Sequence, residues 1–245
     1  MNNKRNSIAS LFLSFCLISV SVFADLPKSK AITQEKQSSL TPQRALELLK
    51  EGNQRFKTNQ MRDYNYSHEM KVTSTMGQHP LAIILNCIDS RSIADLLFDQ
   101  GLGNLFVSRV AGNVVDKDIL GGMEFATKVA GAPLILVMGH THCGAVSGTC
   151  SSGANTGLEN LDYLMGKIEP AVLSVRQDDK TFSCKDEATV DKIAKQNVIN
   201  QLKEILANSS VISDLVANKS IYLVGAMHHI GTGEIEYFDS QGKAL

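Results

Sequence analysis

The sequence of 245 residues lacks a strong net charge, internal repeats, low-complexity tracts and an apolar run long enough to cross a membrane. Its formal net charge is −1, from 24 Lys and Arg against 25 Asp and Glu. So balanced a composition argues against nucleic acid or an anionic membrane surface as a binding partner. The sequence also contains no tryptophan, an absence that bears on regulation below.

The longest apolar stretch, residues 8–23, is interrupted by serines and falls short of the ~20 residues needed to span a bilayer. Lys4 and Arg5 precede it, and small Ala24 follows it. This pattern predicts a secretory signal peptide over residues 1–24, and therefore an exported, periplasmic protein without a stable membrane anchor. Its removal takes two basic residues, leaving 22 (24 − 2) against 25 acidic ones and a net charge of −3.

The rest of the chain has two parts. Residues 25–40 are polar and are expected to form a flexible segment, whereas residues 41–245 are long enough for one domain with a sizeable core. Thr41 and Pro42 predict the start of an N-terminal amphipathic helix, which needs the sheet or another subunit to cover its apolar face.

From residue 81 onward, strand-like apolar runs alternate with helical patterns, which predicts an α/β fold with a mostly parallel sheet flanked by helices. The predicted strands are residues 81–86, 105–109, 133–139, 220–227 and 234–239. The predicted helices are residues 93–98, 121–130, 158–177 and 188–207. Because few residues join the last two strands, a crossover helix is excluded and the final strand is expected to be an antiparallel edge.

Two clusters of reactive side chains each follow a predicted buried strand. Cys87 follows the first strand, and His140 and Cys143 follow the third. Such loops lie at the carboxyl ends of parallel strands, where open α/β sheets place their chemistry. Two thiolates and one imidazole form the ligand set of a tetrahedral zinc site, and three protein ligands leave the fourth position for water. The sequence therefore predicts a catalytic zinc site with one ion per chain.

The first cluster also contains Asp89 and Arg91. The Asp89 carboxylate can accept a hydrogen bond from zinc-bound water and orient it, while Arg91 holds Asp89 and keeps it ionised. The alternative is a carboxylate at the start of a helix with a solvated basic neighbour. Two thiolates make bound water less acidic than in a site built from histidines alone, so a neighbouring base is useful.

These motifs resemble the Cys-x-Asp-Ser-Arg and Gly-His-x-x-Cys-Gly segments of the β-class carbonic anhydrases, and the similarity runs from about Thr41 to Asp239. The resemblance implies a mostly parallel sheet with one antiparallel edge strand, and assembly as a homodimer or homotetramer. It also implies a zinc lyase that interconverts carbon dioxide and bicarbonate by attack of zinc hydroxide on carbon dioxide.

The resemblance further assigns a substrate pocket. Gln78 matches the family's amide that hydrogen-bonds a bicarbonate oxygen, and Phe106 matches the aromatic wall of the carbon dioxide pocket. A tyrosine commonly completes that wall, whereas here the segment contains Phe125. In some relatives the aspartate that corresponds to Asp89 closes on zinc, and the sequence does not distinguish that form from the open one.

Family members that bicarbonate inhibits at a second site use a tryptophan, an arginine and a tyrosine there. This chain has Ile84 and His228 at the first and last of these positions, and only Arg109 fits. The sequence therefore predicts that this inhibitory site is absent.

Two other functions stay open for the same motifs. The zinc site could hydrolyse carbon disulfide or carbonyl sulfide, or the protein could be a non-catalytic zinc protein that binds bicarbonate. The presence of Asp89, Arg91 and Gln78 argues against the non-catalytic alternative.

Two further groups of residues have no assigned role. His142, His228 and His229 are candidate proton carriers, but each is also ordinary as a surface or hydrogen-bonded residue. Cys150 and Cys184 form a disulfide or stay as buried free thiols, since the sequence does not show whether their Cα atoms lie within ~7 Å.

Overall fold

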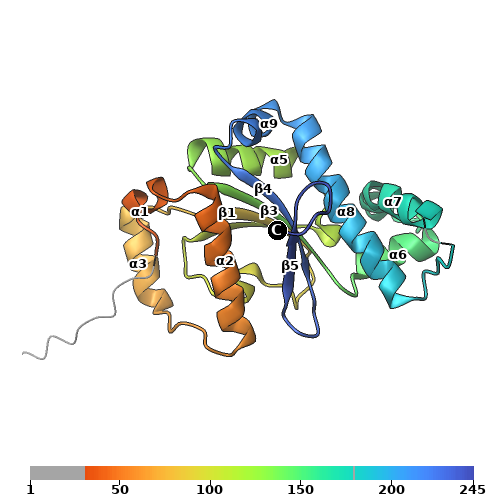
Figure 1. Cartoon of the computed structure of the whole chain (residues 1–245), viewed down its shortest axis with the longest axis horizontal. Coiled ribbons are helices and arrows are strands. Elements are labelled where there is room, and N and C mark those ends of the chain that lie inside the picture. Colours follow the sequence, from red (N-terminus) through yellow and green to blue (C-terminus); the bar gives the residue numbers. More distant parts are fainter. Residues whose placement is uncertain (1–30, 179) are drawn as a thin grey trace, which may run out of the picture.

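Five strands form one sheet in the order β2-β1-β3-β4-β5 in the computed structural model (Figure 1), which describes residues 31–178 and 180–245. The four parallel strands are β1 (Ala82–Asn86), β2 (Leu105–Arg109), β3 (Leu134–His140) and β4 (Tyr222–His228). The short β5 (Ile235–Phe238) pairs antiparallel with β4. The predicted α/β fold with an antiparallel edge strand is therefore confirmed.

The sheet is covered by apolar side chains on both faces, because successive residues of a strand point to opposite sides. Ile83, Leu85 and Val137 face a core shared with α5 (Lys117–Glu124), α7 (Glu159–Asp178), α8 (Glu187–Asn208) and α9 (Ser210–Ala217). Ile84 and Leu136 face a second core shared with α2 (Pro42–Lys57) and α4 (Ala94–Leu97). The buried runs of β1 and β3 thus reflect strands covered on two sides.

The N-terminal helix α2 begins where the sequence predicts. The Thr41 hydroxyl accepts a hydrogen bond from the backbone N–H of Arg44 at 3.1 Å, and Pro42 occupies the first turn. Gly52 lies so close to α4 that an added Cβ would be 1.8 Å from the carbonyl oxygen of Phe98. This glycine allows α2 to pack directly on the segment that follows β1.

The expectation of a flexible segment over residues 25–40 is wrong for residues 31–40. Ile32 is buried, and the short helix α1 (Gln34–Ser38) packs on the domain. The Gln37 amide donates hydrogen bonds to the carbonyl oxygens of Pro80 at 2.8 Å and Ala130 at 2.9 Å. Polar composition therefore reflects hydrogen bonding rather than flexibility in this part. Residues 25–30 and the predicted signal peptide lie outside the described residues.

Several helices differ from the predicted pattern. The helix expected at residues 121–130 begins at Lys117 as α5 and continues as a π-helical turn, η2 (Phe125–Val129). Two further helices, α3 (Tyr66–Met76) and α6 (Gly144–Ser152), were not predicted, and neither was α9.

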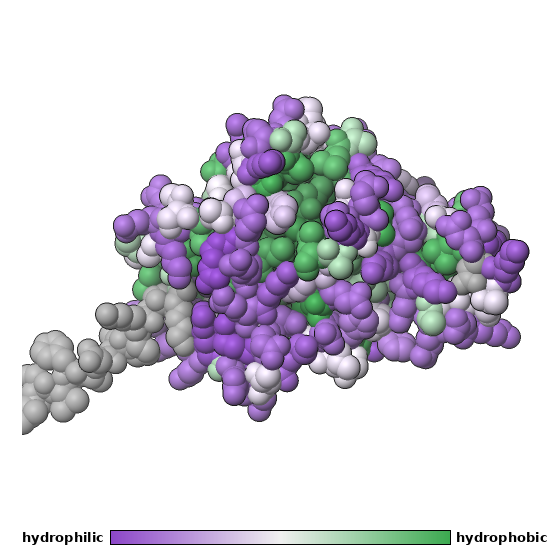
Figure 2. Space-filling view, in the orientation of Figure 1, coloured by the Kyte–Doolittle hydropathy of each residue, from purple (hydrophilic) through white to green (hydrophobic). Residues whose placement is uncertain are grey.

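No helix in the described part of the chain is both long and apolar enough to cross a membrane. Figure 2 shows hydrophobic residues mainly over the centre of this face, between α2 and α8.

Candidate metal centre

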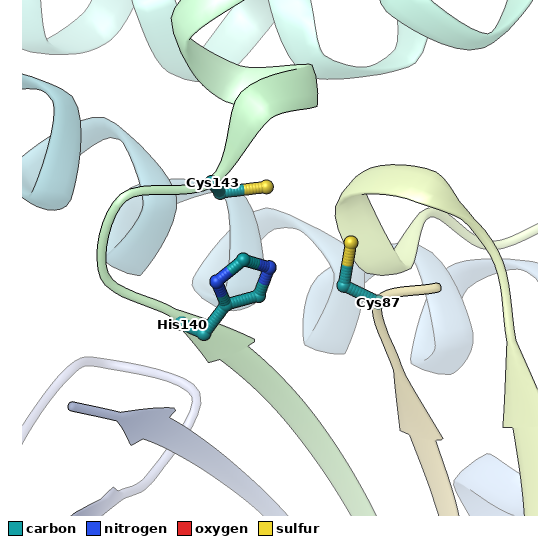
Figure 3. A group of neighbouring side chains, drawn as sticks. All are labelled: Cys87, His140 and Cys143. Atoms are coloured by element: carbon teal, nitrogen blue, oxygen red, sulfur yellow. The ribbon is translucent and has the colours of Figure 1, made fainter. Parts of the chain in front are cut away.

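The parallel pairing of β1 with β3 brings the two reactive clusters together at the carboxyl edge of the sheet. The sulfur atoms of Cys87 and Cys143 and a ring nitrogen of His140 all lie within 4.8 Å of one another, and all three residues are buried. The three side chains turn toward one another from the end of β1, the end of β3 and the start of α6 (Figure 3). Among the described residues, they form a group that could hold a metal ion.

The turn between the two ligands of the second cluster is held by neighbouring elements. The Thr141 N–H donates to the carbonyl oxygen of His228 at 3.0 Å, and the Thr141 hydroxyl accepts from the N–H of Ile230 at 3.0 Å. His142 has a φ of 55°, a left-handed conformation that is uncommon outside glycine, and its N–H donates to Asp191 on α8 at 2.9 Å. Contacts to β4 and α8 therefore set the position of the ligand turn.

The orientation of His140 leaves one ring nitrogen for a metal. Nδ1 lies 2.9 Å from the carbonyl oxygen of Thr141, so it carries the proton and donates it. Nε2 is buried and has no hydrogen-bond partner in the described part of the chain. Burying an unpaired nitrogen costs free energy, so a bound cation facing the two thiols accounts for this arrangement. Two sulfurs and one nitrogen suit zinc, and the residues fit that ion.

The electrostatics favour a thiolate at Cys87. The hydrogen bond from the Cys143 thiol lowers the pKa of Cys87, and the Gly112 N–H, 3.4 Å from the Cys87 sulfur, acts in the same direction. Gly112 belongs to the turn η1 (Ala111–Asn113) and has a φ of 67°. Its added Cβ would lie 2.5 Å from a side-chain carbon of Ile168, so a glycine is required for this approach. Zinc ligation needs deprotonated thiols, and this environment assists the first deprotonation.

Asp89 and Arg91 form the ion pair that the sequence predicts. The Arg91 guanidinium donates to both Asp89 oxygens, at 3.0 Å and 2.7 Å, and holds the pKa of that carboxyl well below its usual range. Oδ2 of Asp89 also lies 3.9 Å from Nε2 of His140. The alternative of a carboxylate that caps a helix does not fit, because α4 begins only at Ala94.

A shell of hydrogen bonds that sequence reasoning missed surrounds these residues. Arg109 donates to the carbonyl oxygens of Cys87 at 3.0 Å and Asp89 at 2.6 Å. His228 lies opposite His140 in the β3–β4 register, and its Nδ1 is 3.2 Å from the Ser92 hydroxyl. Burial lowers the pKa of His228 to about 4. One sequence signal indicated that His228 lies beside the candidate ligands, namely its position directly after a predicted parallel strand.

The two predicted pocket residues lie away from this centre within one chain. Phe106 pairs with Ile83 near the start of β1, whereas Cys87 follows the end of that strand. Four residues of strand separate them by roughly 13 Å along the sheet. Gln78 precedes β1 and is therefore at the amino edge, where its Cβ lies near Gly103. Phe106 contacts Phe125, and their ring centroids lie 6.1 Å apart.

Comparison with known proteins identifies relatives over most of the chain. Residues 82–235 match the family model described as carbonic anhydrase. Carbonic anhydrase 2 of Mycobacterium tuberculosis is 35% identical over 205 residues, which cover 82% of this chain and 95% of that protein. A carbonic anhydrase of Mycolicibacterium smegmatis is 33% identical, covering 80% of this chain and 92% of its own.

Solved structures share the fold at lower identity. The β-carbonic anhydrase CcaA aligns with a TM-score of 0.66 and 24% identity over 82% of this chain and 91% of its own. One of two tetrameric β-carbonic anhydrases from Sordaria macrospora aligns with a TM-score of 0.63 and 24% identity, over 70% of this chain and 86% of its own. The five-stranded sheet and its flanking helices thus occur in these proteins.

Proposed function

The chain belongs to the β-carbonic anhydrase family. We propose that Cys87, His140 and Cys143 hold one zinc ion per chain, and that carbon dioxide is reversibly hydrated there to bicarbonate and a proton. The single observation that carries the proposal is the convergence of three buried ligand atoms beside the Asp89–Arg91 pair. The relatives named carbonic anhydrase support the proposed reaction.

A zinc ion in this site would act as a Lewis acid that lowers the pKa of a water molecule and so makes it a better nucleophile. The chain's own groups then position the reactants. Asp89 is ionised because Arg91 occupies one side of its carboxylate, and its Oδ2 lies at the edge of the ligand group. There it accepts a hydrogen bond from the attacking water and aims a lone pair at carbon dioxide.

The substrate pocket, in this proposal, is completed by a second copy of the chain. Gln78 and Phe106 lie at the amino edge of their own sheet, so a second copy would bring them beside the metal centre of its partner. The surface next to Phe106 is apolar and exposed, with Phe125 at 54% and Val129 at 72%. Burial of this surface in a homodimer or homotetramer is supported further by the tetrameric structural relatives.

The proposed site of action is the periplasm, with residues 1–24 removed as a signal peptide. The described part supports export through the Cys150–Cys184 disulfide, because such bonds form and persist in oxidising compartments. The sequence left open whether these two cysteines form a disulfide or stay as free thiols, and the structure has the disulfide.

A stopped-flow assay of carbon dioxide hydration on zinc-loaded protein tests the proposed reaction. Rates well above the uncatalysed reaction, together with one zinc per chain, are the expected result. Hydrolysis of carbonyl sulfide or carbon disulfide without carbon dioxide hydration would replace the proposal with the first alternative. Zinc binding without either activity would replace it with the non-catalytic one.

A further inference from the structure

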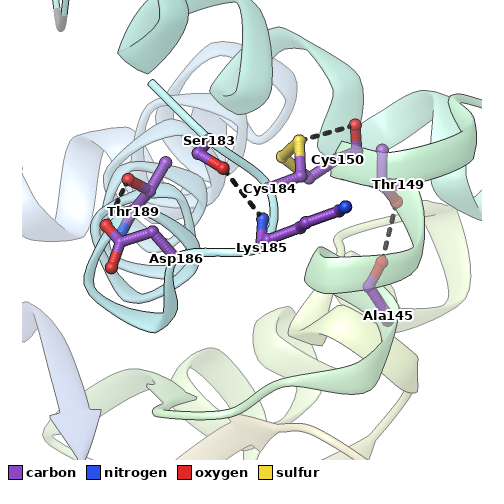
Figure 4. The surroundings of a disulfide bond; sticks show 8 residues. All are labelled: Ala145, Thr149, Cys150, Ser183, Cys184, Lys185, Asp186 and Thr189. Carbon is purple, nitrogen blue, oxygen red and sulfur yellow. Dashed lines mark hydrogen bonds between the residues drawn. A yellow bond between two sulfur atoms is a disulfide. The ribbon is translucent and has the colours of Figure 1, made fainter. Parts of the chain in front are cut away.

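The Cys150–Cys184 disulfide joins two segments that flank the metal-ligand turn. Cys150 lies on α6, the helix that begins directly after the ligand Cys143, and Cys184 lies in the loop before α8 (Figure 4). Cys150 is seven residues beyond Cys143 (150 − 143), so about two helical turns separate the cross-link from the ligand. The disulfide therefore fixes the helix that carries one ligand to the start of α8.

The start of α8, which follows Cys184, also contacts the turn between His140 and Cys143. The Asp186 carboxylate caps α8 by accepting from the N–H of Thr189 at 3.0 Å and from its hydroxyl at 2.7 Å. Asp191, seven residues beyond Cys184 (191 − 184), accepts the 2.9 Å hydrogen bond from the N–H of His142. The cross-link and this hydrogen bond thus close a ring that contains the ligand turn.

The ring matters because the turn has a conformation that needs support. His142, between the two ligands, has a φ of 55°, which costs free energy in a residue with a side chain. The Asp191 carboxylate offsets that cost only while α8 keeps its place relative to α6. Both helices are stiff on this length scale, so the junction at Cys150–Cys184 helps to fix the distance between Asp191 and the turn.

The disulfide is also within reach of a reductant. Cys150 is buried, but Cys184 lines an open hollow of about 280 Å³. The same hollow is bounded by His142 and Asp191, so it separates the cross-link from the ligand turn. Because Cys184 is only partly buried and lines this hollow, a small reductant can reach this residue from solvent without passing through the core.

From this arrangement we propose that the Cys150–Cys184 disulfide is a redox-sensitive brace for metal retention, and that Asp191 is the positioning residue through which it acts. The proposal rests on the zinc site proposed above. In the reducing step a dithiol exchanges with the disulfide: the sulfur–sulfur bond of the protein breaks and two thiols form. The two electrons and two protons come from the dithiol, which becomes a disulfide.

The test measures zinc release from the full mature protein. Zinc-loaded protein is mixed with excess chelator, with and without prior reduction by a phosphine, which takes up oxygen from water as the two thiols form. Reduction is expected to weaken zinc affinity about 10- to 100-fold, the usual effect of losing an outer-shell contact, and so to speed the transfer of zinc to the chelator. The variant Cys150→Ala/Cys184→Ala, given the same phosphine, is the control, since it should release zinc rapidly with or without reductant.

Variants of Asp191 separate the local effect from a general loosening. Asp191→Ala, with the disulfide intact, should release zinc as fast as reduced protein, and reduction should add little more. Asp191→Asn keeps an acceptor oxygen for the His142 N–H and should retain zinc nearly as well as the unmodified protein. Asp239→Ala removes a carboxylate that also accepts backbone hydrogen bonds, but at the chain's C-terminal end, and should have no effect.

Three outcomes would contradict the proposal that the Cys150–Cys184 disulfide supports metal retention through Asp191. Equal release rates for oxidised and reduced protein would show that the disulfide does not act on the metal. Slow release from Asp191→Ala would show that it does not act through this residue. Loss of zinc only in step with loss of helical circular dichroism would show that reduction acts on the whole fold. Protein that never contains stoichiometric zinc would instead contradict the zinc site itself.

Discussion

Both carboxylate oxygens of Asp89 accept hydrogen bonds from Arg91, while Oδ2 of the same carboxylate lies 3.9 Å from Nε2 of His140. The residue is thus bound on one side and faces the ligand group on the other. Because the Arg91 side chain is 53% exposed, this ion pair contributes little to the free energy of unfolding. The role of the pair is instead to fix the position of the negatively charged Asp89 carboxylate beside the ligand group.

Asp89→Asn is expected to retain zinc and to lower the rate of carbon dioxide hydration by at least about 100-fold. The amide has the same shape but is neither an anion nor an acceptor on both arms, so Arg91 no longer holds it and water is not oriented. Zinc content and stopped-flow rates measure the two effects separately. Full activity with bound zinc would show that the pair is structural.

Cys87→Ser and His140→Ala should each lose stoichiometric zinc and activity together. Either change removes one of three protein ligands, and a two-ligand site binds the ion far less tightly. Metal analysis after gel filtration gives the stoichiometry. His229→Ala is the matched control for metal content, because this histidine pairs with Glu236 instead and should keep stoichiometric zinc. Variants at Cys87 and His140 that retain one zinc per chain would refute the ligand assignment.

The strands could be predicted because their signal is local. Residues 81–85 and 134–138 are continuous apolar runs, as strands buried on both faces require. Helix α6 gave no such signal, since glycine, serine and threonine occupy much of it and only three of its residues are buried. Its helical state depends on packing against α7 and α8. Propensity reasoning fails where tertiary contacts decide the conformation.

The convergence of the three candidate ligands could be predicted for a similar reason, and their surroundings could not. Cys87, His140 and Cys143 follow recognisable strands, and the carboxyl ends of neighbouring parallel strands meet. Asp191 contacts the ligand turn across 49 residues of sequence, and Gln37 binds carbonyl oxygens 43 and 93 residues away. No periodicity in the sequence encodes such long-range hydrogen bonds.

Gly52→Ala should lower the free energy of unfolding by about 2–3 kcal/mol, as overpacking of a tight contact does. The new Cβ would lie 1.8 Å from the carbonyl oxygen of Phe98, so α2 must move away from the end of α4. Urea unfolding measures the change. Gly121→Ala is the control, because no described atom lies within 4 Å of its added Cβ, and it should gain about 0.5–1 kcal/mol. Equal effects of both changes would exclude a packing cause at Gly52.

Mixing two inactive variants should restore activity if a second copy completes the pocket. A dimer of Cys87→Ser with Gln78→Ala contains one site with intact ligands and an intact Gln78 from the other chain. With random exchange, half of the dimers are mixed, so about one quarter of all sites are expected to be complete. Stopped-flow rates before and after subunit exchange check this, with each variant alone as reference. A mixture no more active than the average of its parents would place Gln78 outside the partner's site.

Bicarbonate is expected to inhibit by ordinary product competition, without a steep cooperative loss at lower pH. Burial lowers the pKa of His228 to about 4, so this histidine is neutral from roughly pH 6.5 to 9 and offers no charge to a second bicarbonate. Arg109 donates to two backbone carbonyl oxygens, and Ile84 is buried where inhibited relatives have tryptophan. Rates measured across that pH range, with and without added bicarbonate, should fit one proton and a competitive term. A multi-proton loss below about pH 8 that deepens with bicarbonate would contradict this expectation and would indicate that Asp89 closes on the metal.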